Sequence, residues 1–233
     1  MTIAGMPGVI GCIDCTHIAL QMPTHPRPEI FRNRKGYFSL NVQAVCGPKL
    51  EFYNIVARWP GSAHDSNIFN NSRLCQELED DLHPGHLLGD SGYPCRNYLL
   101  TPLTSPQSRG DIRYNAAHIT TRNAIERAFG LLKRRFACLR EKMRTSQTTA
   151  QHIVVAAAVL HNYAIMHRVP EPDDVPLVGD TDALQNDPYN PEDRVDQRAQ
   201  DQFEDNQLRQ QPHAMRNIQG AHKRMQIIRE HFT

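Results

Sequence analysis

The chain has 233 residues, of which 39% are apolar, so it can bury one sizeable core and still carry a tail. Its apolar runs are far shorter than the roughly 18 to 20 residues that cross a membrane, and its N-terminus lacks the basic and then apolar layout of a signal peptide. Six cysteines at irregular spacings favour a reducing compartment over a disulfide framework. We therefore expect a soluble globular protein without a membrane partner.

Charge is unevenly distributed along the chain. Residues 1–170 hold 19 Lys and Arg against 12 Asp and Glu, whereas residues 171–233 hold 7 against 13. An excess of positive charge favours a polyanion through the release of counterions, although it says nothing about sequence preference. The composition thus predicts a basic body with an acidic tail, and DNA is a suitable partner for such a body.

The first predicted element is a strand over residues 8–20 that is buried on both faces. Its apolar run is interrupted by Asp14, whose carboxylate would be costly to bury without a cation, hydrogen bonds or an exposed strand end. A metal ion is one explanation, and backbone hydrogen bonds at a strand end explain the residue equally well. Cys12 and Cys15 form a C-x-x-C pair, but no second pair follows at zinc-finger spacing, which disfavours zinc or redox chemistry.

Residues 21–36 contain three prolines and end in a basic cluster that includes Lys35. This cluster is either a contact for a phosphate backbone or a solvated run of charge. Residues 37–46 alternate apolar and polar side chains and predict a half-buried strand, and a Gly-Pro-Lys turn leads into another strand over residues 50–59. We expect these two strands to form an antiparallel hairpin.

Two further acids stand at the ends of predicted elements. Asp65 lies near the start of a helix predicted from residue 63, where it would cap the helix or act as a fourth acidic ligand. Asp90 ends a short apolar strand over residues 86–89 and precedes a glycine turn. This order places its carboxylate at the carboxyl edge of a sheet, where clefts form in open α/β folds. Residues 101–117 predict a loop.

A helix predicted over residues 121–139 carries Glu126 at the border of its apolar stripe. Considered alone, Glu126 is explained better by a structural role than by a catalytic one. It could form a capping box with Asn123, or an i,i+4 ion pair with Arg122 that is worth only some tenths of a kcal/mol. Lys133 is among the residues that make the outer side of this helix basic, as would suit nucleic acid.

The C-terminal part of the chain divides into three segments. Residues 149–166 predict a second, more buried helix. Residues 169–212 are rich in proline and acids, which predicts a disordered linker after a body of residues 1–168. Residues 213–233 predict an amphipathic segment that docks on the body or on a partner.

The predicted order of three strands, a helix, a fourth strand and two helices matches a ribonuclease H-like α/β fold with an antiparallel start. Four motifs then resemble, in the right order, the DDE domain of PIF/Harbinger transposases and of the nucleases derived from them. They are GVIGCIDCTH from residue 8, WPGSAHDS from residue 59, LLGDSGY from residue 87 and IERAFG from residue 125. The resemblance covers residues 1–168.

This resemblance implies a function as well as a fold. It implies a DDE triad of Asp14, Asp90 and Glu126, with Asp65 as an additional metal-associated acid. It also implies Mg²⁺ or Mn²⁺ as the cofactor, hydrolysis or strand transfer of DNA phosphodiester bonds through two metal ions, and a location in the nucleus, possibly shared with the cytoplasm. In this family a separate Myb-like protein assists the recognition of DNA.

Two expectations complete the hypothesis. Family members usually carry a helical region before the first catalytic strand, whereas eight residues precede Val9, so we expect that region to be absent here. Lys35, Lys133 and Arg134 are expected to contact phosphates. The alternative function is a domesticated protein that binds DNA or acts as a scaffold and whose acidic site is idle; it would bind DNA without turnover.

Overall fold

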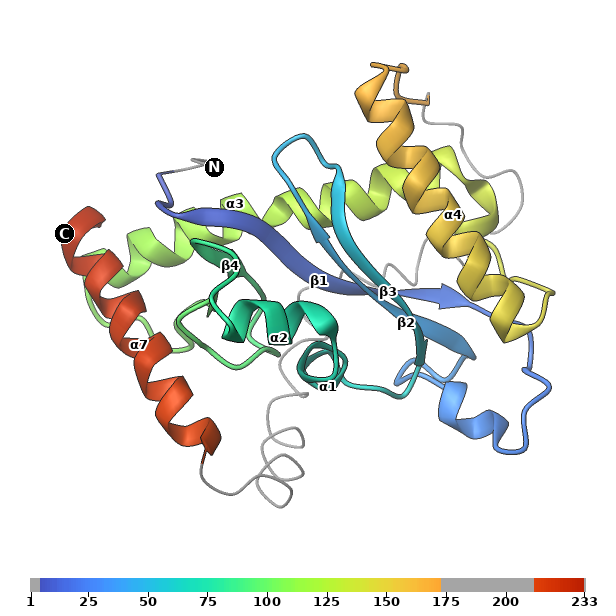
Figure 1. The fold of residues 1–233 in the computed structure, drawn as a ribbon, viewed down its shortest axis with the longest axis horizontal. Coiled ribbons are helices and arrows are strands. Elements are labelled where there is room, and N and C mark those ends of the chain that lie inside the picture. The colour runs from blue at the N-terminus through green and yellow to red at the C-terminus, as the bar shows by residue number, and fades with distance from the viewer. Residues whose placement is uncertain (1–4, 173–211, 233) are drawn as a thin grey trace.

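Five strands form one mixed sheet in the order β3-β2-β1-β4-β5 (Figure 1). The computed structural model of the chain describes residues 5–172 and 212–232. β1 lies at the centre of the sheet, where it pairs antiparallel with β2 and parallel with β4. This topology confirms the ribonuclease H-like α/β fold. The strands are β1 (Val9–Ala19), β2 (Ser39–Cys46), β3 (Phe52–Pro60), β4 (His86–Leu88) and β5 (Leu99–Leu100).

Helices cover both faces of this sheet and give the protein three layers. The cluster of buried apolar side chains on one face includes residues of α3 and α4, and the cluster on the other face includes residues of α1 and α2. The helices are α1 (Asp65–Asn70), α2 (Arg73–Glu79), α3 (Arg109–Arg135), α4 (Gln147–Met166) and α7 (Pro212–His231), with short 3-10 helices at Pro28–Phe31 and Ala137–Leu139.

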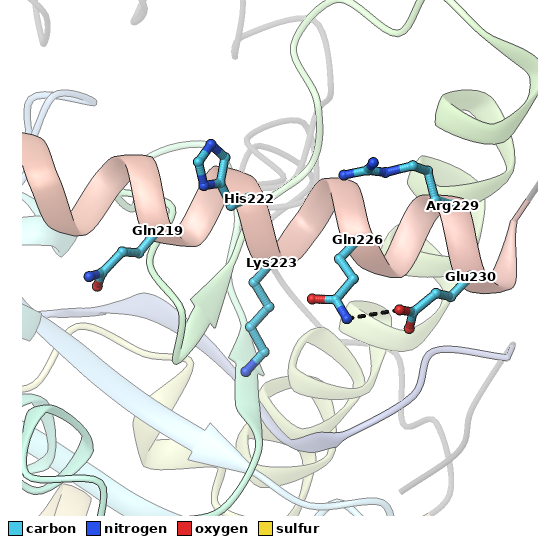
Figure 2. Close-up of a pocket in the computed structure, with 6 residues that line it drawn as sticks. All are labelled: Gln219, His222, Lys223, Gln226, Arg229 and Glu230. Atoms are coloured by element: carbon cyan, nitrogen blue, oxygen red, sulfur yellow. Dashed lines mark hydrogen bonds between the residues drawn. The ribbon is translucent and has the colours of Figure 1, made fainter.

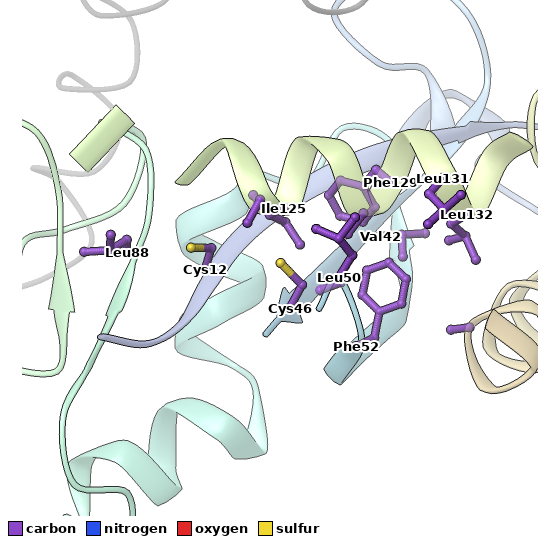
Figure 3. Packing of buried hydrophobic residues seen from close by; sticks show 14 of the residues in the cluster. Cys12, Val42, Cys46, Leu50, Phe52, Leu88, Ile125, Phe129, Leu131 and Leu132 are labelled. Atoms are coloured by element: carbon purple, nitrogen blue, oxygen red, sulfur yellow. The ribbon is translucent and has the colours of Figure 1, made fainter. Parts of the chain in front are cut away.

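The central strand β1 contributes side chains to both of these cores. Cys12 lies in the cluster below α3, and Ile13 lies in the cluster below α1, because successive side chains of a strand point to opposite faces. Figure 3 shows Ile125 and Phe129 of α3 directed into the first of these clusters. Each fully buried apolar side chain contributes about 1.5–3 kcal/mol. The same alternation directs Asp14 toward α3.

The predicted antiparallel hairpin is confirmed by the pairing of β2 with β3. Two other details of this region differ from prediction. β2 is buried along its whole length instead of on one face, since helices lie on both sides of it. The helix predicted from residue 63 is divided into α1 and α2, because the Ser72 hydroxyl accepts a hydrogen bond from the Cys75 amide (3.1 Å) and so caps a new helix.

The start of α3 is the largest departure from prediction. The helix begins at Arg109, so the predicted loop over 101–117 is wrong from that residue onward. A reciprocal capping box sets this start, in which Ser108 and Asp111 each accept a hydrogen bond from the other's backbone amide. Asn123 therefore lies inside the helix, and its interpretation as a cap for Glu126 is wrong.

α4 is buried on one side only, which corrects the prediction of a more buried helix. Val154 packs in the core, whereas Val159, Tyr163 and Met166 are exposed by 62%, 57% and 69%. The helix contains no Asp, Glu, Lys or Arg. Even so, neither α4 nor any other helix among residues 5–172 and 212–232 is long and apolar enough to cross a membrane.

The predicted C-terminal segment forms α7, which docks on the body. Lys223 donates a hydrogen bond to the carbonyl of Asn97 (2.6 Å), and Arg224 donates one to the carbonyl of Thr101 (3.1 Å).

The predicted linker over 169–212 lies almost entirely outside the described residues. An open hollow runs along α7 (Figure 2) and is lined by Gln219, His222, Lys223, Gln226, Arg229 and Glu230.

Gly220 allows α7 to pack closely on the backbone of Arg96, and a substitution of this glycine tests the docking. A Cβ atom on Gly220 would lie 2.4 Å from Cα of Arg96, too close for backbone that cannot move aside. We expect Gly220→Ala to cost about 1–3 kcal/mol, as overpacking does, and to lower the melting temperature by several degrees in calorimetry.

Gly130→Ala is the matched control, because Gly130 also lies in a helix but has nothing within 4 Å of its added Cβ. It should leave the melting temperature unchanged or raise it through helix propensity. A Gly220→Ala variant as stable as Gly130→Ala would contradict the docking of α7 on Arg96.

Candidate metal centre

Two of the predicted acids lie just beyond the paired parts of neighbouring parallel strands. Cys12 of β1 pairs with Leu88 of β4, and Asp14 and Asp90 each lie two residues beyond these partners. Asp14 is inside β1 and Asp90 follows the end of β4, so the pairing brings the two carboxylates to the place where β4 ends. Asp14 is buried, and Asp90 is half-buried, with its carboxylate accepting a hydrogen bond from the amide of Gly92 (3.0 Å). The strand pairing itself thus gathers the two acids.

Asp65 approaches the same place from α1. It is the first residue of that helix, where an acid complements the helix dipole. The side-chain amide of Asn41, on β2, donates to the Asp65 carboxylate (2.9 Å) and to the carbonyl of Ala63 (2.8 Å). Asp65 is therefore both a first-turn acid of α1 and a neighbour of the other acids. Nothing in the sequence pattern pointed to Asn41.

Glu126 is linked to Asp14 by an arginine that contacts both side chains. Arg122 donates to Asp14 (2.6 Å) and, one helical turn away, to Glu126 (2.5 Å). The predicted i,i+4 pair thus exists, but it is not the surface pair that was expected, because the Arg122 side chain is only 6% exposed. Sequence reasoning missed its contact with Asp14, and the one available signal was that Arg122 lies a turn before Glu126 on the same side. We call Asp14, Asp65, Asp90 and Glu126 the acidic cluster.

Burial and mutual repulsion perturb these acids. Burial, followed by the charge of Asp90, raises the pKa of Asp14 to about 7, and the Arg122 guanidinium offsets only part of this rise. The pKa of Asp65 is also raised, again by burial and then by Asp90. Burial is the larger cause of both rises, and the repulsion from Asp90 adds to it. A divalent cation would relieve that repulsion.

The donor chemistry of the acidic cluster suits Mg²⁺ or Mn²⁺, which prefer carboxylate oxygens. The arrangement of the side chains in the described residues, in contrast, does not form an ion site. Across residues 5–172 and 212–232, no group of three or more His, Cys, Asp and Glu side chains is placed so that it could hold an ion. Two of the acids, Asp14 and Glu126, are instead paired with the guanidinium of Arg122.

The two cysteines beside Asp14 are not arranged for zinc or redox chemistry. Cys12 points toward α3, where its thiol donates to the carbonyl of Thr121, and Cys15 lies 3.4 Å from the Tyr93 hydroxyl. Burial raises the pKa of both thiols, that of Cys12 to about 12. Both therefore stay protonated at neutral pH and are poor metal ligands or nucleophiles.

Two of the three predicted phosphate contacts lie together near the end of β1. Lys133 donates to the Thr16 hydroxyl (2.8 Å) and to the carbonyl of His17 (3.3 Å), and burial lowers its pKa to about 8. After burial, the charges of Lys133, Lys35 and Arg34 lower the pKa of His17 to about 4. Lys133 contacts Thr16 and His17, and the charges of Lys35 and Arg34 also act on His17. All three cations thus lie near the part of β1 that is two to three residues beyond Asp14.

Arg134, the third predicted contact, is directed elsewhere. Its guanidinium pairs with Glu171 (3.2 Å), and that of Arg135 donates to the carbonyl of Val169 (3.1 Å). Both partners lie in the segment that follows α4. The structure thus brings Lys35 and Lys133 near His17 of β1 and places Arg134 against a different part of the chain.

The chain is similar to known proteins. A family model described as a DDE superfamily endonuclease matches residues 13–162, a range that contains the whole acidic cluster. "Putative nuclease HARBI1" of Homo sapiens is 38% identical over 169 residues, which cover 71% of this chain and 48% of the relative. The protein of that name from Mus musculus is 36% identical over 195 residues, or 79% and 56%.

A plant relative is more distant. "Protein ALP1-like" of Arabidopsis thaliana is 29% identical over 192 residues, which cover 75% of this chain and 47% of the relative. No solved structure gives a significant match. The chain spans about half the length of the curated relatives it matches. The family model and the vertebrate relatives together show that the chain belongs to the DDE superfamily of endonucleases.

Proposed function

We propose that the chain is a divalent-metal-dependent DNA nuclease that hydrolyses phosphodiester bonds by the two-metal route. The observation that carries the proposal is the parallel pairing of β1 with β4, which places Asp14 and Asp90 each two residues beyond the pair of Cys12 with Leu88. Membership of the DDE endonucleases supports DNA as the substrate. We also propose a location in the nucleus, with the cytoplasm as a second compartment, and a Myb-like partner for target recognition.

The proposed roles follow from position. Asp14 and Asp90 would be ligands shared by two ions, Glu126 would complete the second site, and Asp65 would support the first, oriented by Asn41. When bound, the ions would supply an activated water and stabilise the leaving 3′ oxygen. Lys35 and Lys133 would hold the phosphate backbone beside the acids, and Arg134 remains a weaker candidate for such a contact.

One observation favours the alternative of a DNA-binding or scaffolding protein with an idle site. Arg122 neutralises part of the charge of Asp14 and Glu126 without any ion. An idle site could be stable in that state, and the chain would then bind DNA through its basic residues without cutting it. Turnover separates the two functions.

Plasmid nicking tests the proposed chemistry. In Mg²⁺ or Mn²⁺ we expect Asp90→Asn to lower the nicking rate by about a hundredfold or more, because removal of one charged ligand weakens both ions. Asp80→Asn, the same change at an exposed helix end, should nick at the wild-type rate. Nicking by Asp90→Asn at the wild-type rate, or nicking that persists in excess chelator, would exclude this mechanism.

The raised pKa of Asp14 predicts how metal binding depends on pH. An ion needs the deprotonated carboxylate, so the affinity for metal should rise by up to about tenfold per pH unit below 7 and level off above it. The stability of the metal-free protein should respond to pH in the opposite sense. The pKa of Asp14 is higher in the folded than in the unfolded state, so the protonated Asp14 side chain stabilises the fold at low pH. This stabilisation is lost as the pH rises from about 4 through 7.

Melting temperatures with and without Mn²⁺ between pH 5.5 and 8.5 measure both trends. The stabilisation by Mn²⁺ should grow up to about pH 7, and Asp14→Asn should abolish that growth. A stabilisation of constant size over this range would show that Asp14 does not titrate as described.

Binding of DNA tests the basic residues separately from catalysis. We expect Lys35→Gln to weaken DNA binding and to reduce the slope of log affinity against log salt by about one. Lys49→Gln is the matched control. Lys49 is also exposed, but it lies beyond the opposite end of β2, an eight-residue strand that is roughly 26 Å long. Equal losses for the two variants in titrations with labelled duplex would indicate a general effect of charge instead of a contact at Lys35.

A further inference from the structure

Arg122 is a buried cation placed between two members of the acidic cluster. Its two terminal nitrogens donate separately, one to Oδ2 of Asp14 and the other to Oε1 of Glu126. The Arg122 and Asp14 side chains are exposed by only 6% and 8%, so water screens this interaction poorly. A carboxylate oxygen held by a guanidinium in this way is also an oxygen that a hard metal ion would need.

The remaining two acids are held by neutral donors. Asp65 accepts from the Asn41 amide, and Asp90 accepts from the backbone amide of Gly92. A neutral donor fixes a carboxylate without cancelling its charge, and a metal-bound carboxylate commonly keeps such a partner. The cluster therefore has two acids already compatible with an ion, whereas two others are engaged by a cation.

The backbone leaves little freedom for these groups to separate. Arg122 and Glu126 lie one turn apart in α3, whose Ile125 and Phe129 are buried in the core, and Asp14 is fixed in the central strand. An ion that takes up Glu126 and Asp14 must therefore displace the guanidinium by a change of side-chain rotamers alone. The guanidinium and the ion compete for the same oxygen atoms.

We propose that Arg122 is a built-in counter-ion that competes with the divalent ion for Asp14 and Glu126 and thereby sets the affinity of the centre for metal. This inference rests on the proposed function, since it concerns the same site. The competition falls most heavily on the ion that Glu126 completes, because both acids engaged by Arg122 would bind that ion, whereas the other ion would use only Asp14 of the two. The ion that Glu126 completes should bind more weakly than the one supported by Asp65 and Asp90, so the two affinities of the wild-type chain should differ.

The competition makes a prediction that a merely structural salt bridge would not. A buried salt bridge that only supports the fold would lower stability when removed and leave metal binding unchanged or weaker. Removal of a competing cation instead tightens metal binding, because it frees the oxygens and removes the repulsion between like charges. It also destabilises the metal-free protein, because Asp14 and Glu126 lose their counter-ion.

Calorimetric titration with Mn²⁺, together with melting temperatures in chelator and in Mn²⁺, tests the proposal on the full chain. We expect Arg122→Gln to melt below the wild type in chelator, to bind the weaker ion about tenfold more tightly and to gain more melting temperature from Mn²⁺. Arg122→Lys keeps the charge but loses the fork that reaches both acids, so it should fall between the two. Arg127→Gln removes the same charge from an exposed position of α3 and should match the wild type.

The outcomes separate this inference from the proposed function. If Mn²⁺ binds the wild type in a manner that Asp90→Asn abolishes, but binds Arg122→Gln no more tightly, then Arg122 is not a competitor and the metal centre stands. If neither the wild type nor Arg122→Gln binds Mn²⁺, the proposed function is overturned, and this inference with it. Binding by Arg122→Gln alone would support both.

Discussion

The ion pair between Asp14 and Arg122 joins the central strand to α3, the longest helix among residues 5–172 and 212–232. It crosses 108 positions of sequence and lies where the sheet and α3 exclude water. A buried pair gives little net stability, but removal of one partner costs about 3–5 kcal/mol, because the other charge is left buried and unpaired. The pair therefore fixes the position of α3 above the middle of β1, and the place of Glu126 relative to the other acids follows from it.

Much of the fold could be predicted from local patterns. The apolar run of β1, the alternation in β2 and the turn before β3 each signal a strand, and the acids at strand ends indicated the edge where a site would form. The start of α3 could not be found in this way. Its first turns are covered by α7 instead of the sheet: Gly110 approaches Ile228, and the ring of Tyr114 packs on Phe232. A helix face whose partner lies more than 100 residues away gives a weak local signal.

The candidate site was predictable to a different extent. The resemblance of four motifs to a known family pointed to the four acids, whereas the residue types alone left structural explanations open for Asp14 and Glu126. What the sequence could not supply were the groups that orient them, such as Arg122 and Asn41, since their roles depend on which elements pack together. Lys133 and Arg134 illustrate the same limit: they are neighbours in sequence on one helix, but they contact different segments, Thr16 on β1 and Glu171 after α4.

The register between β1 and β4 has a consequence for how the chain can change over evolutionary time. Cys12 of β1 pairs with Leu88 of β4, and Asp14 and Asp90 each lie two positions further along the chain. Since side chains alternate between faces, one residue inserted into or lost from either short interval would rotate a carboxylate to the wrong side of the sheet. Replacement of the apolar residues in these strands is a lesser disturbance by comparison. Length variation among descendants of this sequence should therefore be confined to the connections between elements, while the spacing within these two intervals stays constant.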